Sequence, residues 1–385
     1  MKLKGYRRRD GSVGIRNHIL VIPTVICASK VAEEIANHVV GAIYLPNQHG
    51  CNHLDIDLKH VINTLIGMGK NPDVAAVLFV GLGCETVPTK YIAEEVRKSG
   101  KETECLIIQE EGGTLKTEEK GIRILSDMSQ RIGNIERDEL DLSDITVAIE
   151  CGGSDAASGI TANPVAGYVA DKVVSEGGTV IFSETTEIIG AEHILAKRAV
   201  AEEVKDKLLN TVKNCEERAL SFNKDIRGVN PTPGNMQGGI STIEEKSLGA
   251  ICKAGTMPIQ GVLDYAEKPS GKGLYFMDTP GQDVESMTGM VAGGAQLIIF
   301  TTGRGTPTGS PIAPVIKMIS NSTAYERMKD NIDVNVGTII EGKETIEEAG
   351  ERVFKEMISV INGKYTKSEI LGHREFGIYL VSPTL

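Results

Sequence analysis

Short apolar runs that end in polar turns recur along this chain. They include ILVIPTVICAS (19–29), VAAVLFVGLGCET (74–86), ITVAIECGGSDAASG (145–159), TVIFSETTEIIG (179–190) and QLIIFTTGRGTPTGSPIAPVIK (296–317). Each run is a candidate buried strand, and each turn is rich in glycine, hydroxyl groups or charged side chains. Stretches with helical periodicity separate the runs, which is typical of βαβ units. The sequence therefore predicts an α/β fold with mostly parallel sheets flanked by helices.

The alternation divides the chain into two expected domains. Residues 1–136 hold four candidate strands and four candidate helices, about the content of a flavodoxin-like domain. The acidic stretch ERDELDLSD (136–144) marks the boundary, although a helix cap would also explain its charges. Residues 137–385 are expected to form a larger Rossmann-like domain. Within it we expect one long helix from Ala191 to about Asn223 and an edge strand in REFGIYLVSP (374–383).

The polar turns are candidate parts of one site, because ligands of parallel sheets bind outside the carboxyl ends of the strands. A guanidinium in the turn after Phe300 can hold a carboxylate with two parallel hydrogen bonds. The turn GGSDAASG offers groups that can hydrogen-bond hydroxyls, and the prolines of NPTPGN make a rigid turn. The candidate substrate-binding residues are Arg304, Thr302, Ser154, Asp155, Asn230, Asn235 and Arg16.

Acid–base candidates also lie at these strand ends. Glu85, Glu150 and Glu187 each sit at or near the end of an apolar run, where proton abstraction or metal ligation is feasible, although helix capping is the alternative role. Lys317 is a fourth candidate, either in catalysis or on a substrate carboxylate, unless it merely covers its own helix.

Composition and charge exclude several classes of function. A net charge of −11 makes nucleic acid an improbable partner. No apolar stretch approaches the roughly 18 residues of a membrane span, and the N-terminus lacks the apolar core of a signal peptide, so we expect a cytoplasmic protein with no membrane partner. Seven cysteines, an odd number, favour reduced thiols, metal ligands or core residues over disulfides. Neither a P-loop nor a dinucleotide fingerprint is present, which disfavours a nicotinamide-dependent oxidoreductase.

Longer motifs resemble those of one known family over essentially the whole chain. The chain resembles the altronate and galactarate dehydratases and the large subunit of sulfolactate sulfo-lyase. The motifs are GSVGIRN (11–17), HGC (49–51), GLGCE (81–85), ECGGSDAASGITANP (150–164), SETTEIIGAE (183–192), NPTPGN (230–235), EEKSLG (244–249), MDTPG (277–281), VAGGA (291–295) and FTTGRGTPTGSPIAPVIK (300–317).

The resemblance implies a lyase that removes water, or alternatively sulfite, from a small-molecule 2-hydroxy acid to give a 2-oxo acid. It implies a divalent metal, most simply Fe²⁺ with Mn²⁺ as an alternative, because the enediolate formed from a carboxylate needs a cationic clamp. The candidate metal ligands are His49, Cys51, His53, Cys84 and Cys151. An iron–sulfur cluster on Cys27, Cys84 and Cys151 is a further alternative.

The resemblance also implies a partner. Single-chain members carry a small β-rich module ahead of this region, whereas the first family motif here begins near Gly5. We therefore expect a separate small β-rich subunit, together with a homo-oligomer of this chain. The alternative from another class is a non-catalytic subunit that binds a sugar acid and only scaffolds an enzyme.

Overall fold

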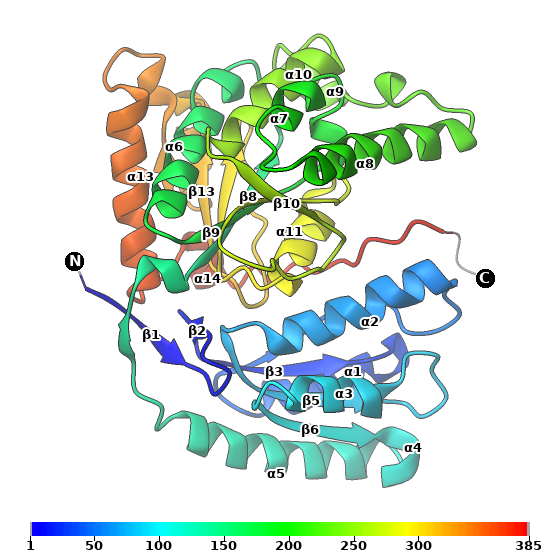
Figure 1. The fold of residues 1–385 in the computed structure, drawn as a ribbon. Coiled ribbons are helices and arrows are strands. Elements are labelled where there is room, and N and C mark those ends of the chain that lie inside the picture. The colour runs from blue at the N-terminus through cyan, green and yellow to red at the C-terminus, as the bar shows by residue number, and fades with distance from the viewer. Residues whose placement is uncertain (1, 383–385) are drawn as a thin grey trace.

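Two parallel β-sheets flanked by helices form the body of the protein, which confirms the predicted α/β class (Figure 1). The structure is a computed structural model that describes residues 2–382. In the described part of the chain, no helix is both long enough and apolar enough to cross a bilayer.

The smaller sheet has the strand order β4-β3-β5-β6. It is built from β3 (His18–Pro23), β4 (Ala42–Tyr44), β5 (Val74–Gly81) and β6 (Glu102–Ile107). All eight residues of β5 are buried, because both faces of the sheet are covered by helices. These helices are α1 (Ser29–Asn37), α2 (Asp55–Lys70), α3 (Thr89–Arg97), α4 (Ile108–Glu111) and α5 (Thr114–Ile132).

The larger sheet has seven parallel strands in the order β10-β11-β9-β8-β12-β13-β14. The carboxyl ends of β11, β9, β8 and β12 therefore lie side by side at its centre. The strands are β8 (Thr146–Gly152), β9 (Thr179–Phe182), β10 (Ile259–Leu263), β11 (Gly273–Met277), β12 (Leu297–Thr302), β13 (Val315–Ile319) and β14 (Val334–Asn335). The helices are α6 (Ala162–Ser175), α7 (Glu192–Ala196), α8 (Glu202–Ser221), α9 (Pro233–Gln237), α10 (Ile243–Ala250), α11 (Asp283–Ala292), α12 (Ser322–Arg327), α13 (Ile346–Ile361) and α14 (Lys367–Leu371).

The two sheets share a buried apolar layer, because α2 packs directly against α11 between them (Figure 1). Gly67 allows the close approach, since a Cβ there would lie 2.3 Å from the carbonyl oxygen of Ala292. Asn71 then donates hydrogen bonds from Nδ2 to the carbonyl oxygens of Val291 and Ala295, each at 2.8 Å. A three-stranded antiparallel sheet joins the two parts elsewhere, from β1 (Leu3–Arg7), β2 (Val13–Gly14) and β7 (Asp138–Leu140).

Three expectations about local structure were wrong. The long helix expected from Ala191 is two helices, α7 and α8, because residues 198–200 pair with Ile259, the first residue of β10. Lys317 lies on β13 rather than on a helix. The expected edge strand is an irregular extended segment over its described part, 374–382, because several of its amides bond to side chains. Val381 and Ser382, for example, donate to the carboxylate of Asp57. Pro383 lies outside the described residues.

Candidate functional site

Three carboxylates meet at the centre of the larger sheet. Glu150 lies near the end of β8, Glu184 follows β9, and Asp283 begins α11, which comes after β11. One oxygen from each of the three lies within 4.8 Å of the others. Glu150 and Glu184 are fully buried and Asp283 is half-buried. Because β11, β9 and β8 are neighbours, the sheet order itself brings these residues together.

Local contacts fix the two buried glutamates. The backbone of Glu184 has a φ of 78°, and its N–H donates to Thr279 Oγ1 at 2.9 Å. Its Oε2 accepts hydrogen bonds from the Cys151 N–H at 3.0 Å and from the ammonium of Lys253. Glu150 Oε2 accepts a hydrogen bond from Ser286 Oγ at 2.7 Å. One oxygen of each glutamate is therefore held in place by the fold.

The other oxygen of each glutamate has no partner among the described residues. Glu150 Oε1 and Glu184 Oε1 are both buried without a hydrogen bond. A buried polar atom left unpaired costs about 1–3 kcal/mol, so two such atoms beside a third carboxylate are unusual in a stable core. Oxygen-rich carboxylate sets are the ligands that Mg²⁺, Mn²⁺ and Fe²⁺ accept. The residues present therefore fit a divalent cation.

Two lysines and a fourth carboxylate surround the trio. Lys253 is fully buried and pairs with Glu184 and, at 3.5 Å, with Glu187. Lys246 pairs with Glu187 at 2.9 Å and donates to Asn230 Oδ1 at 3.0 Å. With all groups ionised, four carboxylates face two ammonium groups, which leaves two negative charges. A divalent cation would neutralise them.

Burial and mutual repulsion set the protonation of the cluster. Burial, followed by the charge of Glu184, raises the pKa of Glu150 well above its usual range. Burial and the charge of Glu187 likewise raise the pKa of Glu184, and they raise that of Asp283 to about 6. Burial alone would raise the pKa of Glu187 too, but the charges of Lys246 and Lys253 outweigh it, so the net shift is downward. The surroundings of Glu187 therefore favour its ionised form.

Beside the carboxylates, three polar turns meet. Asn235 Nδ2 donates to the carbonyl oxygen of Ser154 at 3.0 Å, and Ser154 Oγ lies 3.1 Å from Cys151 Sγ. Arg304 Nη1 donates to the carbonyl oxygen of Gly234 at 2.8 Å. The Arg304 side chain is exposed, and its Nε and Nη2 make no hydrogen bond with described residues. These two nitrogens are available to a ligand.

The other predicted substrate-binding residues are engaged within the fold. Asp155 Oδ1 accepts hydrogen bonds from Ser158 and Ser320, and Thr302 Oγ1 accepts one from the Gly305 N–H at 2.9 Å. Arg16 lies elsewhere, in a buried ion pair with Glu369 at 2.7 Å. The structure thus gathers Ser154, Asp155, Asn230, Asn235, Thr302 and Arg304 around the end of β8 and leaves Arg16 outside.

The four acid–base candidates have different surroundings. Glu150 belongs to the carboxylate trio and Glu187 to its neighbouring ion pairs. Glu85 lies in the loop after β5 of the smaller sheet, where it accepts hydrogen bonds from the N–H groups of Leu82 and Gly83 at 3.1 and 2.5 Å. Lys317 is fully buried and donates to the carbonyl oxygens of Pro307 and Thr308 at 2.7 and 2.8 Å. It therefore holds the loop that carries Arg304.

The five candidate metal ligands are not brought together around one ion. His49, Cys51, His53 and Cys84 lie beyond the carboxyl ends of the smaller sheet, whereas Cys151 ends β8 of the larger sheet. His53 Nε2 accepts a hydrogen bond from the Gly50 N–H at 3.0 Å. Within the described part of the chain, the carboxylate trio is the one group of three or more metal-type side chains whose ligand atoms all lie within 4.8 Å. Metal binding by the five stays a prediction.

Sequence reasoning missed Glu184, Asp283, Lys246 and Lys253. Glu184 lies two residues after the end of β9, but Glu187, three residues further along, was selected instead. Lys253 was detectable as a single charge within the small and apolar stretch SLGAICKAG (247–255). Asp283 had no local signal, because only the strand order brings α11 to β8 and β9.

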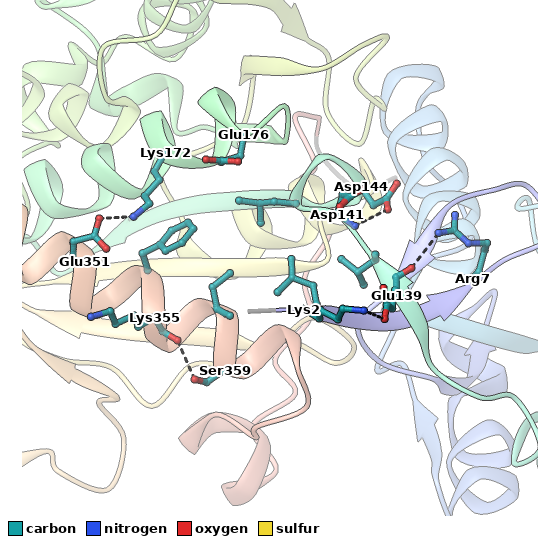
Figure 2. A pocket seen from close by; sticks show the side chains of 15 residues that line it. Lys2, Arg7, Glu139, Asp141, Asp144, Lys172, Glu176, Glu351, Lys355 and Ser359 are labelled. Carbon is teal, nitrogen blue, oxygen red and sulfur yellow. Dashed lines mark hydrogen bonds and ion pairs between the residues drawn. The ribbon is translucent and has the colours of Figure 1, made fainter.

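A large groove lies elsewhere, between β1, β7, α6 and α13 (Figure 2). It encloses about 970 Å³. Its charged side chains pair with one another, as in Lys172 with Glu351 and Lys2 with Glu139. It contains no converging set of unpaired buried groups among the described residues. We therefore place the chemistry at the carboxylate trio rather than in this groove.

Comparison with known proteins agrees with the resemblance seen in the motifs. Residues 5–133 match the family model described as D-galactarate dehydratase/altronate hydrolase, second domain. Residues 142–384 match the model described as D-galactarate/altronate dehydratase, C-terminal.

Several curated proteins are similar along nearly the whole chain. The (2R)-sulfolactate sulfo-lyase subunit beta of Chromohalobacter salexigens is 37% identical, over 97% of this chain and 95% of that protein. The altronate dehydratase of Bacillus subtilis is 33% identical, over 99% of this chain and 78% of that protein. The galactarate dehydratase (L-threo-forming) of Escherichia coli is 35% identical, over 99% of this chain and 77% of that protein.

Proposed function

The chain belongs to the D-galactarate/altronate dehydratase family of lyases, and we propose that it is the large subunit of a sugar-acid dehydratase. The proposed reaction removes water from a 2-hydroxy acid that carries a hydroxyl at carbon 3, and the product is a 2-oxo acid. The single observation that carries this proposal is the pair of unpartnered, buried oxygens of Glu150 and Glu184 beside Asp283. They offer a place for a cation at the carboxyl ends of the central strands.

Glu150, Glu184 and Asp283 would hold a divalent metal, and we propose Fe²⁺ or Mn²⁺. When bound, such an ion supplies the Lewis acidity that an α-proton beside a carboxylate requires before it can be removed. We assign Glu187 as the proton acceptor, because its ion pairs keep it ionised next to the trio. We assign Lys246 as the proton donor to the leaving hydroxyl. Burial lowers the pKa of Lys246, but the charge of Glu187 acts against burial and the net shift of the pKa is upward, so the amine carries the proton that it would donate.

The substrate carboxylate is assigned to Arg304. Its free Nε and Nη2 groups can make two parallel hydrogen bonds to a carboxylate. The turn formed by Gly152 and Gly153 relates Arg304 to the trio. A Cβ on Gly153 would lie 3.7 Å from Arg304 Cβ, whereas one on Gly152 would touch Asp283. Consecutive residues of one turn thus border both parts of the proposed site.

We further propose that this chain works with a separate small β-rich subunit, as a homo-oligomer in the cytoplasm. The relative from Chromohalobacter salexigens is named a subunit, and this chain spans 95% of its length. The name of that relative supports a two-subunit enzyme.

The similarity to the sulfo-lyase subunit, at 37% identity, favours a second candidate reaction, the release of sulfite from a 2-hydroxy acid with a sulfonate at carbon 3. The proton acceptor and the carboxylate site would be unchanged, and only the leaving group would differ. A co-purified complex, supplied anaerobically with Fe²⁺ or Mn²⁺, should be assayed on altronate, galactarate and sulfolactate. Formation of 2-oxo acid without sulfite supports the dehydratase, and equimolar sulfite supports the sulfo-lyase. No 2-oxo acid from any of the three contradicts both.

Variants at the trio test the site itself. Glu150→Gln and Glu184→Gln should lose both Mn²⁺ binding, measured by calorimetry, and 2-oxo acid formation. Glu351→Gln is the matched control, because this glutamate lies on α13 in a partly exposed pair with Lys172. Unchanged Mn²⁺ binding in both trio variants would contradict the proposed metal site.

A further inference from the structure

Three cysteines of the smaller sheet are exposed, and all three lie beyond the same edge of that sheet. Cys27, Cys51 and Cys84 follow β3, β4 and β5 respectively. The four other cysteines of the chain are buried or half-buried. Cysteine is among the most often buried residue types, so three exposed thiols at one edge need an explanation. None of the three takes part in the carboxylate trio.

Backbone hydrogen bonds hold the three loops against one another. The loop after β4 crosses the end of β3 and reaches the loop after β5. The Ile26 N–H donates to the carbonyl oxygen of His49 at 3.1 Å, and the Thr86 N–H donates to that of Gly50 at 3.1 Å. Ile26 is adjacent to Cys27, Gly50 is adjacent to Cys51, and Thr86 is two residues after Cys84. The three cysteines therefore lie in loops that are in direct contact with one another.

These loops are built to stay in place. Gly50 has a φ of 126°, and a Cβ there would lie 2.2 Å from the carbonyl oxygen of Thr24, so only glycine allows the contact with the β3 loop. Glu85 fixes the β5 loop, because its carboxylate accepts hydrogen bonds from two N–H groups of that loop and, at 2.7 Å, from Thr89 Oγ1. Glu85 Oε1 also accepts one from Thr24 Oγ1 at 3.3 Å, which ties the two loops together.

The positions of the three sulfur atoms argue against a single metal ion and leave a metal cluster as the alternative. A single ion needs all its ligand atoms in one coordination sphere, and these three sulfurs do not all lie within 4.8 Å of one another. A cubane cluster binds each cysteine through a different iron, so its thiolates stand farther apart. We propose that Cys27, Cys51 and Cys84 bind a [4Fe–4S] cluster whose fourth iron has no cysteine ligand.

The surroundings suit such a cluster. With three thiolates a [4Fe–4S]²⁺ core carries a net negative charge, and α1 and α3 begin at Ser29 and Thr89, directly after two of the loops. Helix N-termini stabilise negative charge. Binding of the cluster does not rest on the proposed function.

Anaerobic reconstitution of the full chain with equal amounts of ferrous and ferric iron and with sulfide tests the proposal, because a [4Fe–4S]²⁺ core contains two irons of each oxidation state. We expect roughly four irons and four acid-labile sulfides per chain, with the visible absorption of a cubane cluster. Thiol alkylation should then modify three fewer cysteines in the reconstituted chain than in the chain after chelation. Iron bound without labile sulfide, or equal alkylation in the two states, would overturn the proposal. Both readouts are independent of lyase activity, so they remain informative if all three hydroxy acids fail as substrates.

Serine variants assign the ligands. Cys27→Ser, Cys51→Ser and Cys84→Ser should each lose most of the cluster absorption. Cys105→Ser is the matched control, because Cys105 lies in β6 of the same sheet but away from these loops. Circular dichroism identifies any variant that fails to fold, and the alkylation comparison on the unmodified chain remains decisive in that case. Equal loss in Cys105→Ser and Cys51→Ser would contradict the assignment.

Discussion

Gly152 leaves the space that the Asp283 carboxylate occupies, since a Cβ on Gly152 would lie 2.4 Å from Asp283 Oδ2 and 2.5 Å from Phe300 Cζ. The backbone of Gly152 does not need glycine for its φ, which is not in the left-handed region. The absence of a side chain is therefore a steric requirement. Because Gly152 has no side chain, Asp283 at the start of α11 can approach the end of β8 and complete the carboxylate trio.

We expect Gly152→Ala to move Asp283 away from Glu150 and Glu184. The added methyl group meets a ring atom of Phe300 on one side, so the carboxylate is the group that yields. Mn²⁺ binding measured by calorimetry should weaken about 10-fold or more, as expected for a displaced ligand. Gly228→Ala is the control, because a Cβ there meets nothing within 4 Å. Equal Mn²⁺ affinity in the two variants would show that Asp283 is not a ligand.

Lys253 should be essential for stability because it neutralises buried carboxylates. Its side chain is 0% exposed and pairs with Glu184, which is also 0% exposed. Lys253→Met would leave a buried carboxylate without its cation, and breaking such a pair costs about 3–5 kcal/mol. We expect that loss in the free energy of unfolding, measured by urea denaturation.

The matched comparison is Lys205→Met. Lys205 pairs with Glu202, but their side chains are 40% and 70% exposed, and exposed pairs contribute about 1 kcal/mol or less. A loss in Lys253→Met no larger than that in Lys205→Met would mean that Glu184 is neutral in the folded protein. The double variant Lys253→Met/Glu184→Gln should recover part of the lost stability, because it removes the unpaired charge as well.

The sequence predicted the strands whose apolar runs are long and missed those whose runs are short. Residues 74–81 and 297–302 are apolar enough to be recognised alone. By contrast, β10 contains Gln260 and Gly261, and it forms a strand because β11 pairs with it. The same contact explains the break between α7 and α8, where residues 198–200 pair with Ile259. Pairing with strands distant in sequence determines these elements, and the local pattern of apolar residues does not indicate such pairing.

The candidate site divides in the same way. Glu150 and Glu187 were recognisable because each lies where an apolar run meets a polar turn. Asp283 is far from both glutamates in sequence and reaches them only through the strand order β11-β9-β8. Lys317 was placed on a helix from the prolines before it, yet it is a buried residue of β13 that bonds to the loop before its own strand. The sequence was enough to select individual residues with suitable chemistry. It was not enough to predict which residues contact one another, because these contacts depend on the order of the strands.

Lys317 should act on the substrate through the Arg304 loop. Burial lowers the pKa of Lys317 to about 8, and its Nζ bonds to two carbonyl oxygens of that loop. Lys317→Met leaves both carbonyls without this donor, at a cost of about 1–3 kcal/mol each. We expect faster amide hydrogen exchange in residues 303–309 and a higher KM for the hydroxy acid, with Mn²⁺ binding retained. Lys355→Met, at an exposed position on α13, should change neither. Unaltered exchange in 303–309 would contradict this role.

We expect Asp73 to make the stability of the protein depend on pH. Its side chain is fully buried, Oδ1 accepts hydrogen bonds from the Ile15 and Arg16 N–H groups, and Oδ2 has no partner among the described residues. Burial raises the pKa of Asp73 from 3.8 to about 7, against the opposing hydrogen bonds and the charges of Arg16 and Arg8. The folded protein therefore holds a proton that the unfolded chain releases between these two values.

Stability should consequently fall as the pH rises from about 4 to about 7 and then level off, with a contribution from this group of at most about 1.4 kcal/mol per pH unit. Asp73→Asn removes the titrating proton and keeps an acceptor for Ile15 and Arg16. The difference in unfolding free energy between Asp73→Asn and the unmodified protein should therefore shift in favour of the variant as the pH rises through this window. Asp330→Asn, at an exposed position, is the control and should show a constant difference. A constant difference for Asp73→Asn as well would mean that Asp73 is ionised in the folded protein throughout, with Arg8 and Arg16 compensating its burial.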